Sequence, residues 1–276
     1  MFKRIMRQRR RLFVGIAGVM AGAILLFGPG LAAQLSALAM ALCSALIVSF
    51  APRFRHWVEA LAFGVPTGAL LPVDADVRIG VILLTTVIFQ RFFSGRSLDG
   101  LPFRVSLSSA RSVTVDAPPR VIWTRLIPGE SHPEDHWTGT LIDFDHDPED
   151  PETLHLRYRN PAGLFDEVTV TFLERAHPRH CRFYIERSEG DYFEEAVMDL
   201  RFIELEEGQT LIESHLCHEP LPLRAALARW LDDAFGDEWD SFAASVSRRT
   251  DWSLHRLAQE GMAGKERSKG DARVIW

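Results

Sequence analysis

The sequence predicts an α+β protein in which transmembrane helices precede an antiparallel sheet with one long amphipathic helix at its end. Six segments rich in Val, Ile, Thr, Phe and Tyr are separated by turn residues, as in hairpin-linked strands. Beyond them, apolar residues recur at three- and four-residue intervals within residues 220–260, the spacing of one helix face. An apolar stripe this wide must pack against a sheet, and we expect the helix to enclose a pocket between itself and that sheet. The stripe consists of Leu227, Trp230, Leu231, Ala234, Phe235, Trp239, Phe242 and Val246.

The charge of the chain differs between its two parts. Residues 1–96 carry eleven Lys/Arg and three Asp/Glu, whereas the remainder carries 20 basic and 34 acidic residues. Basic residues around uncharged apolar runs are typical of the cytoplasm-facing ends of membrane helices. The acidic remainder argues against nucleic acid as a partner. Cys43, Cys181 and Cys217 have no close partner in the sequence, so neither a disulfide scaffold nor a zinc site is indicated.

We expect a transmembrane region over residues 1–96, with about four helices at 12–28, 31–50, 57–73 and 77–93. The second run contains twenty uncharged residues, enough to cross a hydrocarbon core about 30 Å thick at about 1.5 Å per residue. A signal peptide is the alternative for the first run, but the second run follows it immediately. Gly18 and Gly22 form a small-x-x-x-small pair that would let helices approach closely.

The third run is the weakest, because it contains Glu59, Pro66 and several glycines. Four crossings place every basic cluster on one side and leave the following domain in the cytoplasm. If the third run only dips into the bilayer, there are three crossings and the domain lies on the opposite side. We expect four, in an integral membrane protein of a bacterial inner membrane.

Residues 97–103 are expected to form a polar linker, residues 104–260 the α+β domain and residues 261–276 a mobile tail. Asp116 is a candidate N-cap, and Pro118 and Pro119 suit the start of a short helix. The expected strands are 105–115, 136–144, 153–159, 167–174, 180–187, 192–205 and 210–218.

The segment SVTVDAPPRVIWTRL, six further strands and the closing helix together resemble the START-like (SRPBCC) superfamily, also called the polyketide cyclase/dehydrase and lipid-transport group. The resemblance covers residues 104–260 and excludes the transmembrane region. It implies a helix-grip fold, in which a seven-stranded antiparallel sheet wraps around the C-terminal helix and encloses a cavity for a hydrophobic or amphipathic ligand. Such domains include carriers, receptors and cyclases, so the fold does not fix the function.

Strand alternation predicts which side chains face the interior of the domain. A hydroxyl in an apolar wall can orient a ligand's head group, which makes Tyr158 and Ser214 candidate contacts. The predicted inward residues are Leu154, Leu156, Tyr158, Cys181, Phe183, Ile185, Ala196, Met198, Leu200, Phe202, Ile212, Ser214 and Leu216. The expected ligand contacts are Tyr158, Phe183, Met198, Phe202, Ser214, Trp230 and Phe235.

Polar chemistry in the sequence is sparse. Glu213, His215 and Cys217 share one strand face and could form a ligand or general-base trio, but the alternate register is more apolar, so we expect the trio to face outward. No Gly-rich phosphate loop, G-x-S-x-G or H-E-x-x-H motif occurs, and we expect no metal and no cofactor.

The sequence therefore favours a membrane-anchored domain that binds a hydrophobic or lipid-like ligand non-covalently, as a carrier, presenter or sensor. Two alternatives stay open. One is a cyclase-like enzyme with acid–base residues in the cavity, and the other is a protein-interaction module with a packed interior.

Overall fold

The computed structural model describes residues 2–51, 54–95, 99, 102–159, 165–189, 192–247, 249–251 and 253. The chain forms two compact units, which are called here the helical unit (Met1–Pro102 with Pro222–Ala234) and the sheet unit (Phe103–Leu221 with Phe235–Trp276). The expected tail at 261–276 lies outside the described residues, as do residues 254–260 of the expected long helix and most of the linker.

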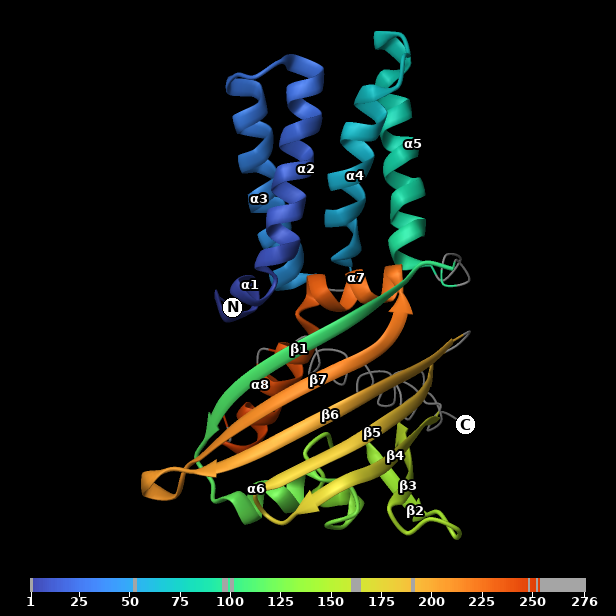
Figure 1. Ribbon diagram of the computed structural model, residues 1–276. Helices are drawn as coiled ribbons and strands as arrows, with labels where there is room; N and C mark the ends of the chain where they lie inside the picture. The colour runs from blue at the N-terminus through green and yellow to red at the C-terminus, as the bar shows by residue number, and fades with distance from the viewer. Residues whose placement is uncertain are drawn as a thin grey trace, which may run out of the picture. The chain divides into compact units, whose positions relative to one another are not determined.

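The helical unit is a row of helices. Figure 1 shows α3, α2, α4 and α5 side by side in that order, with contacts between each adjacent pair. Within the described residues, α2, α3 and α5 are long and apolar enough to cross a membrane, whereas α4 has 15 residues. The elements are α1 (Phe2–Arg7), α2 (Arg9–Phe27), α3 (Leu31–Phe50), α4 (His56–Leu70), α5 (Ala75–Ser94) and α7 (Leu223–Asp232).

Glycines set the close packing of α4 against its two neighbours. A Cβ on Gly18 would lie 2.2 Å from the Ala62 carbonyl oxygen, and one on Gly64 would lie 2.5 Å from Cα of Thr86. Between α4 and α5, the Thr85 hydroxyl donates a 2.8 Å hydrogen bond to the Gly64 carbonyl. The small-residue pair predicted on α2 therefore lies at a helix–helix contact, and α4 is held along its length between α2 and α5.

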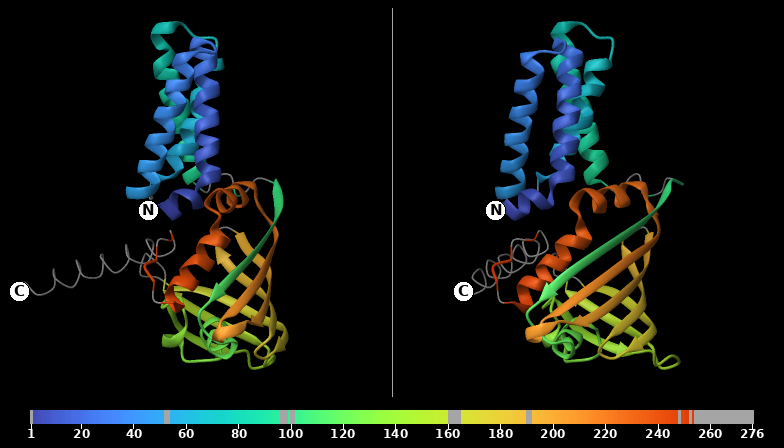
Figure 2. Two further views of the ribbon diagram at one scale, coloured as in Figure 1. Left: turned by 90° about the vertical axis from the view of Figure 1, so that its left-hand side faces the viewer. Right: turned by 60° about the vertical axis from the view of Figure 1, so that its left-hand side comes forward.

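The sheet unit contains a seven-stranded antiparallel sheet in the order β1-β7-β6-β5-β4-β3-β2. The strands curve around α8 (Ala234–Val246), as Figure 2 shows. The strands are β1 (Arg104–Val115), β2 (Leu141–His146), β3 (Thr153–Arg159), β4 (Phe165–Ala176), β5 (His180–Glu189), β6 (Tyr192–Glu204) and β7 (Thr210–Pro222). Between strands lie α6 (Pro119–Leu126), η2 (Pro133–Asp135) and η3 (Glu206–Gly208).

The strand expected to begin at His136 begins instead at Leu141. Residues 136–139 form a turn in which the Gly139 amide donates to the His136 carbonyl at 3.0 Å. Gly139 has a φ of 63°, a left-handed value that glycine adopts without steric cost. The turn delays the start of β2 and leaves His136 outside the sheet.

The predicted alternation of inward and outward residues is confirmed. The inward positions of β3, β5, β6 and β7 are buried or packed against the core, while Glu213, His215 and Cys217 are exposed on the outer face. Helix α6 adds Ile122 and Trp123, both fully buried, which close one end of the core.

The prediction of one long C-terminal helix is wrong, because the helix is divided at Asp233. This residue adopts a left-handed conformation with φ 47° and ψ 46°, which separates α7 from α8. A left-handed residue other than glycine costs about 1–2 kcal/mol, although Asp tolerates it better than most. The carboxylates of Asp232 and Asp233 are paired with Arg7, Arg11 and Arg55, and these ion pairs stabilise the two residues at which the helix is divided.

Candidate functional site

A cavity of about 360 Å³ lies in the sheet unit. Its walls come from the inward faces of β3 to β6, from α8 and from the segment between α6 and β2. The apolar lining consists of Leu126, Pro128, Trp137, Leu156, Val168, Val170, Phe183, Ile185, Met198, Leu200, Phe235, Trp239 and Phe242. A concave site with mainly apolar walls and few polar groups is the usual form of a small-molecule site.

Helix α8 supplies an aromatic wall to this cavity. Phe235, Trp239 and Phe242 recur at intervals of four and three residues, so they share one helix face. The ring centroids of Phe235 and Trp239 lie 6.2 Å apart at 89°, and those of Trp239 and Phe242 lie 5.5 Å apart at 85°. Such edge-to-face contacts contribute interaction energy in addition to that of the buried apolar area, so the three rings stabilise one another's positions.

Charged side chains line one part of the cavity, where β3 and β5 end and β4 begins. They are Arg159, Asp166 and Arg187 from the strands and Glu238 from α8. Tyr158 also lines the cavity, and within the described residues its hydroxyl has no hydrogen-bond partner. Burial raises the pKa of Tyr158 far above its ordinary value, although Arg187 opposes the shift. A neutral phenol is therefore available to a bound molecule.

His136 contributes an uncharged imidazole to the same lining. Its Nδ1 lies 2.9 Å from the Thr138 hydroxyl oxygen, and its ring centroid lies 6.1 Å from that of Tyr158. Burial lowers the pKa of His136 to about 4, and a hydrogen bond with the Leu126 backbone offsets only part of this effect. At pH 7 the ring is neutral and is held in place by the protein itself.

The structure brings four of the seven predicted contact residues together, since Tyr158, Phe183, Met198 and Phe235 line the cavity. The other three lie elsewhere among the described residues. Phe202 packs on Trp123, with ring centroids 5.6 Å apart. The Ser214 hydroxyl donates to the Arg111 carbonyl at 3.0 Å. Trp230 belongs to α7, where the Arg10 guanidinium lies 5.1 Å from its ring centroid.

Sequence reasoning missed two groups of lining residues. His136 and Trp137 lie in a turn without periodicity, so no pattern marked them. The charged residues did carry a signal, because Asp166 precedes Val168 by two and Arg187 follows Ile185 by two, which continues the inward register of each strand. Reading the alternation to the strand ends would have found both.

The outer face of the sheet carries the other polar cluster that the sequence indicated. The His215 Nε2 lies 2.9 Å from the Ser108 hydroxyl oxygen, and Cys217 Sγ lies 3.6 Å from His215 Nδ1. These side chains are exposed, and no group of three or more His, Cys, Asp or Glu residues in the described part of the chain has the arrangement of a metal site.

The sequence matches no protein-family model and no curated protein. Among solved structures it is similar to a conserved protein from Geobacillus kaustophilus, with 12% identity and a TM-score of 0.42 over 51% of this chain and 93% of that chain. A START superfamily protein from Mycobacterium smegmatis has 16% identity and a TM-score of 0.37 over 55% and 97% of the two chains. Ara h 8.0201 has 8% identity and a TM-score of 0.40 over 52% and 96%.

The topology of the sheet unit itself agrees with the expected fold. The first strand leads into helix α6, six antiparallel strands follow, and a helix with an apolar face closes the sheet. By this order of elements, the C-terminal domain fits the START-like helix-grip fold.

Proposed function

We propose that the protein is a membrane-anchored binding protein whose sheet unit holds a small hydrophobic or amphipathic molecule non-covalently, as a carrier, presenter or sensor. The observation that carries this proposal is the cavity between the sheet and α8, with its mainly apolar walls. A protein-interaction module with a fully packed interior would not need such a space.

The size of the cavity limits the ligand. Its volume of about 360 Å³ lies at the lower end of the range of about 300–1,000 Å³ that small-molecule sites span. A site of this size suits a small lipophile, such as a fused-ring compound or a short single chain, better than a two-chain phospholipid. Tyr158 and the nearby charged residues would face the polar end of such a ligand.

Binding accounts for the polar lining better than catalysis does. The His136 ring is neutral at pH 7 because burial lowers its pKa to about 4, and Thr138 already occupies its Nδ1. Burial also raises the pKa of Tyr158, so the phenol does not ionise near pH 7. Neither group is matched to proton transfer at that pH, whereas both suit hydrogen bonding to an uncharged polar group.

Membrane anchoring is supported by α2, α3 and α5, whose length and composition suit a bilayer. Because α4 packs between α2 and α5, we propose that it crosses as a fourth, shorter span. Four crossings put Arg7, Arg10, Arg11 and Arg55 on one side, which the positive-inside bias assigns to the cytoplasm. The sheet unit would then lie on the cytoplasmic side of a bacterial inner membrane, close to a reservoir of apolar molecules.

The proposal can be tested by filling the cavity. Met198 and Val197 are neighbours on β6 that face opposite sides of the sheet, and only Met198 lines the cavity. Met198→Trp would place an indole in the space, and Val197→Trp is the matched control with the same added bulk outside it. Each full-length variant is purified in detergent, and co-purified small molecules are extracted and identified by mass spectrometry.

We expect one small lipophile at near one-to-one stoichiometry in the wild type and in Val197→Trp, and its loss from Met198→Trp. Equal amounts of the same molecules in all three samples would mean that they come from the detergent micelle, and would refute binding in the cavity.

A further inference from the structure

Helix α7 belongs to the helical unit, although it follows the last strand of the sheet in the sequence. Figure 1 shows it lying crosswise at the ends of the longer helices of that unit. Its contacts there come from residues 7–11 at the start of α2, from Arg55 just before α4 and from Asp99 beyond the end of α5. If α2, α4 and α5 cross a bilayer, these residues lie at the level of the lipid headgroups.

An ion pair fixes the first turn of α7 within the helical unit. The Arg224 guanidinium donates two hydrogen bonds to the Asp99 carboxylate, at 2.7 and 2.6 Å. Asp99 is buried, with 3% of its surface exposed. A bidentate pair of this kind restricts both the position and the rotation of the helix that carries the arginine.

Further ion pairs fix the last turn of α7 in the same unit. The Asp232 carboxylate accepts hydrogen bonds from Arg11 Nη1 and from Arg55 Nε, the latter at 3.1 Å. The Asp233 carboxylate accepts one from Arg7 Nη1 at 2.8 Å. Burial would raise the pKa of Asp232, but the two guanidinium groups outweigh it and hold the pKa below its ordinary value. Charged contacts therefore hold α7 at both of its ends.

The middle of the apolar face of α7 is open. Leu223, Leu227 and Trp230 follow one another at intervals of four and three residues, so they share one side of the helix, which we call the α7 stripe. Leu223 is 50% exposed, Trp230 is 41% exposed and Leu227 is half-buried. An amphipathic helix on a water-soluble protein buries this part of its surface.

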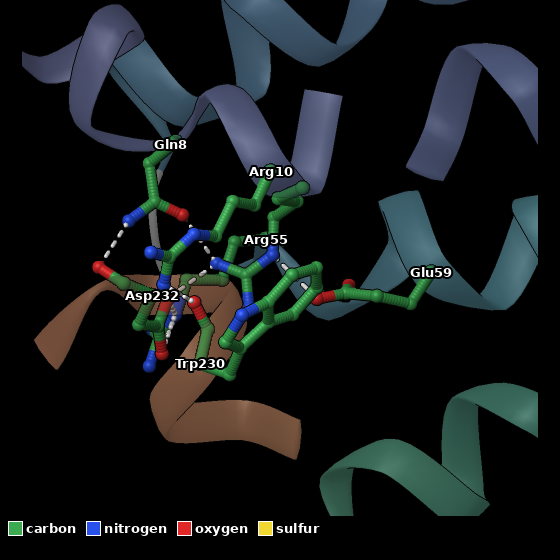
Figure 3. Close-up of polar contacts among 7 residues, drawn as sticks. Gln8, Arg10, Arg55, Glu59, Trp230 and Asp232 are labelled. Atoms are coloured by element: carbon green, nitrogen blue, oxygen red, sulfur yellow. Dashed lines mark hydrogen bonds and ion pairs between the residues drawn. The ribbon is translucent and has the colours of Figure 1, made fainter. Parts of the chain in front are cut away.

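The α7 stripe faces the helices that could cross the membrane. The Arg10 guanidinium of α2 lies 5.1 Å from the centroid of the Trp230 ring, and its Nη1 donates to the Trp230 carbonyl at 2.9 Å. Figure 3 shows this ring directed from α7 toward α2 and α4. Leu223 precedes Trp230 by seven residues, or about two helical turns, so its side chain lies on the same side of α7.

A bilayer has the chemistry that this side of α7 requires. Tryptophan and arginine together are typical of the boundary between headgroups and acyl chains, where the ring meets apolar chains and the cation meets phosphate. The neighbouring parts of the spans are also apolar and exposed, with Phe13 on α2 at 72% and Ile88 on α5 at 57%. Lipid that covers those residues at the basic end of the spans would reach the α7 stripe as well.

We propose that α7 is an in-plane membrane helix, whose stripe of Leu223, Leu227 and Trp230 inserts between the lipid headgroups at the basic end of the spans. The inference rests on the membrane anchoring in the proposed function, and it is independent of whether the cavity holds a ligand. It gives α7 a role different from that of α8, whose apolar face lines the cavity.

The insertion can be tested by spin-label accessibility on the full-length protein in nanodiscs of phosphatidylcholine and phosphatidylglycerol. Single cysteines are introduced into a background without Cys43, Cys181 and Cys217 and are spin-labelled. Collisions of the label are then measured with oxygen, which concentrates in lipid, and with a neutral nickel chelate, which stays in water. Leu223→Cys and Leu227→Cys probe the stripe. Ala228→Cys is the matched control, because adjacent helical residues point about 100° apart.

We expect the ratio of oxygen to nickel collisions to be several times higher at Leu223→Cys and Leu227→Cys than at Ala228→Cys. This ratio cancels the steric hindrance of a half-buried position, and its value at the stripe should correspond to insertion of about 5–10 Å. Equal ratios at all three positions would overturn the inference. Shielding of both stripe positions from both agents would also overturn it, because a protein surface would then cover the stripe.

A label in the middle of α5 separates failure of this inference from failure of the membrane anchoring. Leu84 is 60% exposed, and α5 is apolar enough to cross a bilayer. Leu84→Cys should give the highest ratio of all, since it would lie within the hydrocarbon core. If Leu84→Cys is lipid-exposed but the stripe is not, only the in-plane helix is refuted. If Leu84→Cys gives the ratio of Ala228→Cys, the membrane anchoring is refuted, and the in-plane helix with it.

Discussion

Acid should destabilise the protein through His136 at a pH well above that at which most carboxylates titrate. An unfolded chain has a histidine pKa of about 6.5, whereas burial lowers the pKa of His136 in the folded protein to about 4. Between these values the unfolded state binds the proton and the folded state does not. The stability contributed by the neutral ring is therefore complete above about pH 6.5, and it decreases as the pH falls towards 4.

The size of the effect follows from the two pKa values. At pH 5 the loss amounts to about 2 kcal/mol, and at pH 4 to about 3 kcal/mol. For a domain of this size, about 2 kcal/mol corresponds to a decrease of about 4–8 °C in the melting temperature. Other groups titrate in the same range, so the measurement needs a variant that lacks only this one. His136→Asn keeps a polar group near the Thr138 hydroxyl and has no titratable ring.

The assay is thermal unfolding of the full-length protein and of His136→Asn in one non-ionic detergent at pH 7, 6 and 5. We expect the wild type to lose about 4–8 °C more than the variant between pH 7 and pH 5. Parallel curves for the two proteins would show that His136 is solvated or charged in the folded state. That result would refute the description of this side of the cavity as a buried, neutral wall.

Three further outcomes are expected. Tyr158→Phe should weaken the binding of 1-naphthol, a neutral fused-ring probe, about 2- to 10-fold in equilibrium dialysis, yet leave the melting temperature unchanged, because the hydroxyl has no partner among the described residues. Gly18→Leu should cost about 1–3 kcal/mol or more in thermal unfolding, because its Cβ would meet the Ala62 carbonyl, whereas Gly80→Leu, with nothing within 4 Å, should be neutral. The depressed pKa of Asp232 means that its stabilising contribution is present above about pH 4 and lost as the pH falls below it, so the loss of melting temperature caused by Asp232→Asn should stay constant from pH 7 to pH 5.

The sheet could be predicted from the sequence because each strand buries one face and exposes the other. Alternation with a period of two is a local property, and it correctly placed Leu154, Phe183 and Ile212 inside and His215 outside. The same regularity located Tyr158, Phe183 and Met198 on the cavity wall. Where backbone geometry departs from the period, as in the turn at residues 136–139, the prediction failed and His136 was missed.

The division of the C-terminal helix could not be predicted, because the side chains that bind Asp232 and Asp233 come from distant parts of the sequence. Arg11 and Gln8 are separated from Asp232 by 221 and 224 positions. Nothing in the periodicity of residues 227–246 marks the break. The pattern describes the buried face of α8, with Phe235, Trp239 and Phe242, but not that of α7, where Trp230 is exposed. Trp230 was therefore assigned to the cavity by the phase of a helix that ends two residues later, at Asp232.

The central claim is that the cavity holds a small lipophile, and a crystal structure of the full chain purified from its expression membranes tests it most directly. The account predicts continuous non-protein density for one compact molecule that contacts Trp239 and reaches the Tyr158 hydroxyl. A cavity closed by its own side chains, or one that contains only ordered water, would contradict it.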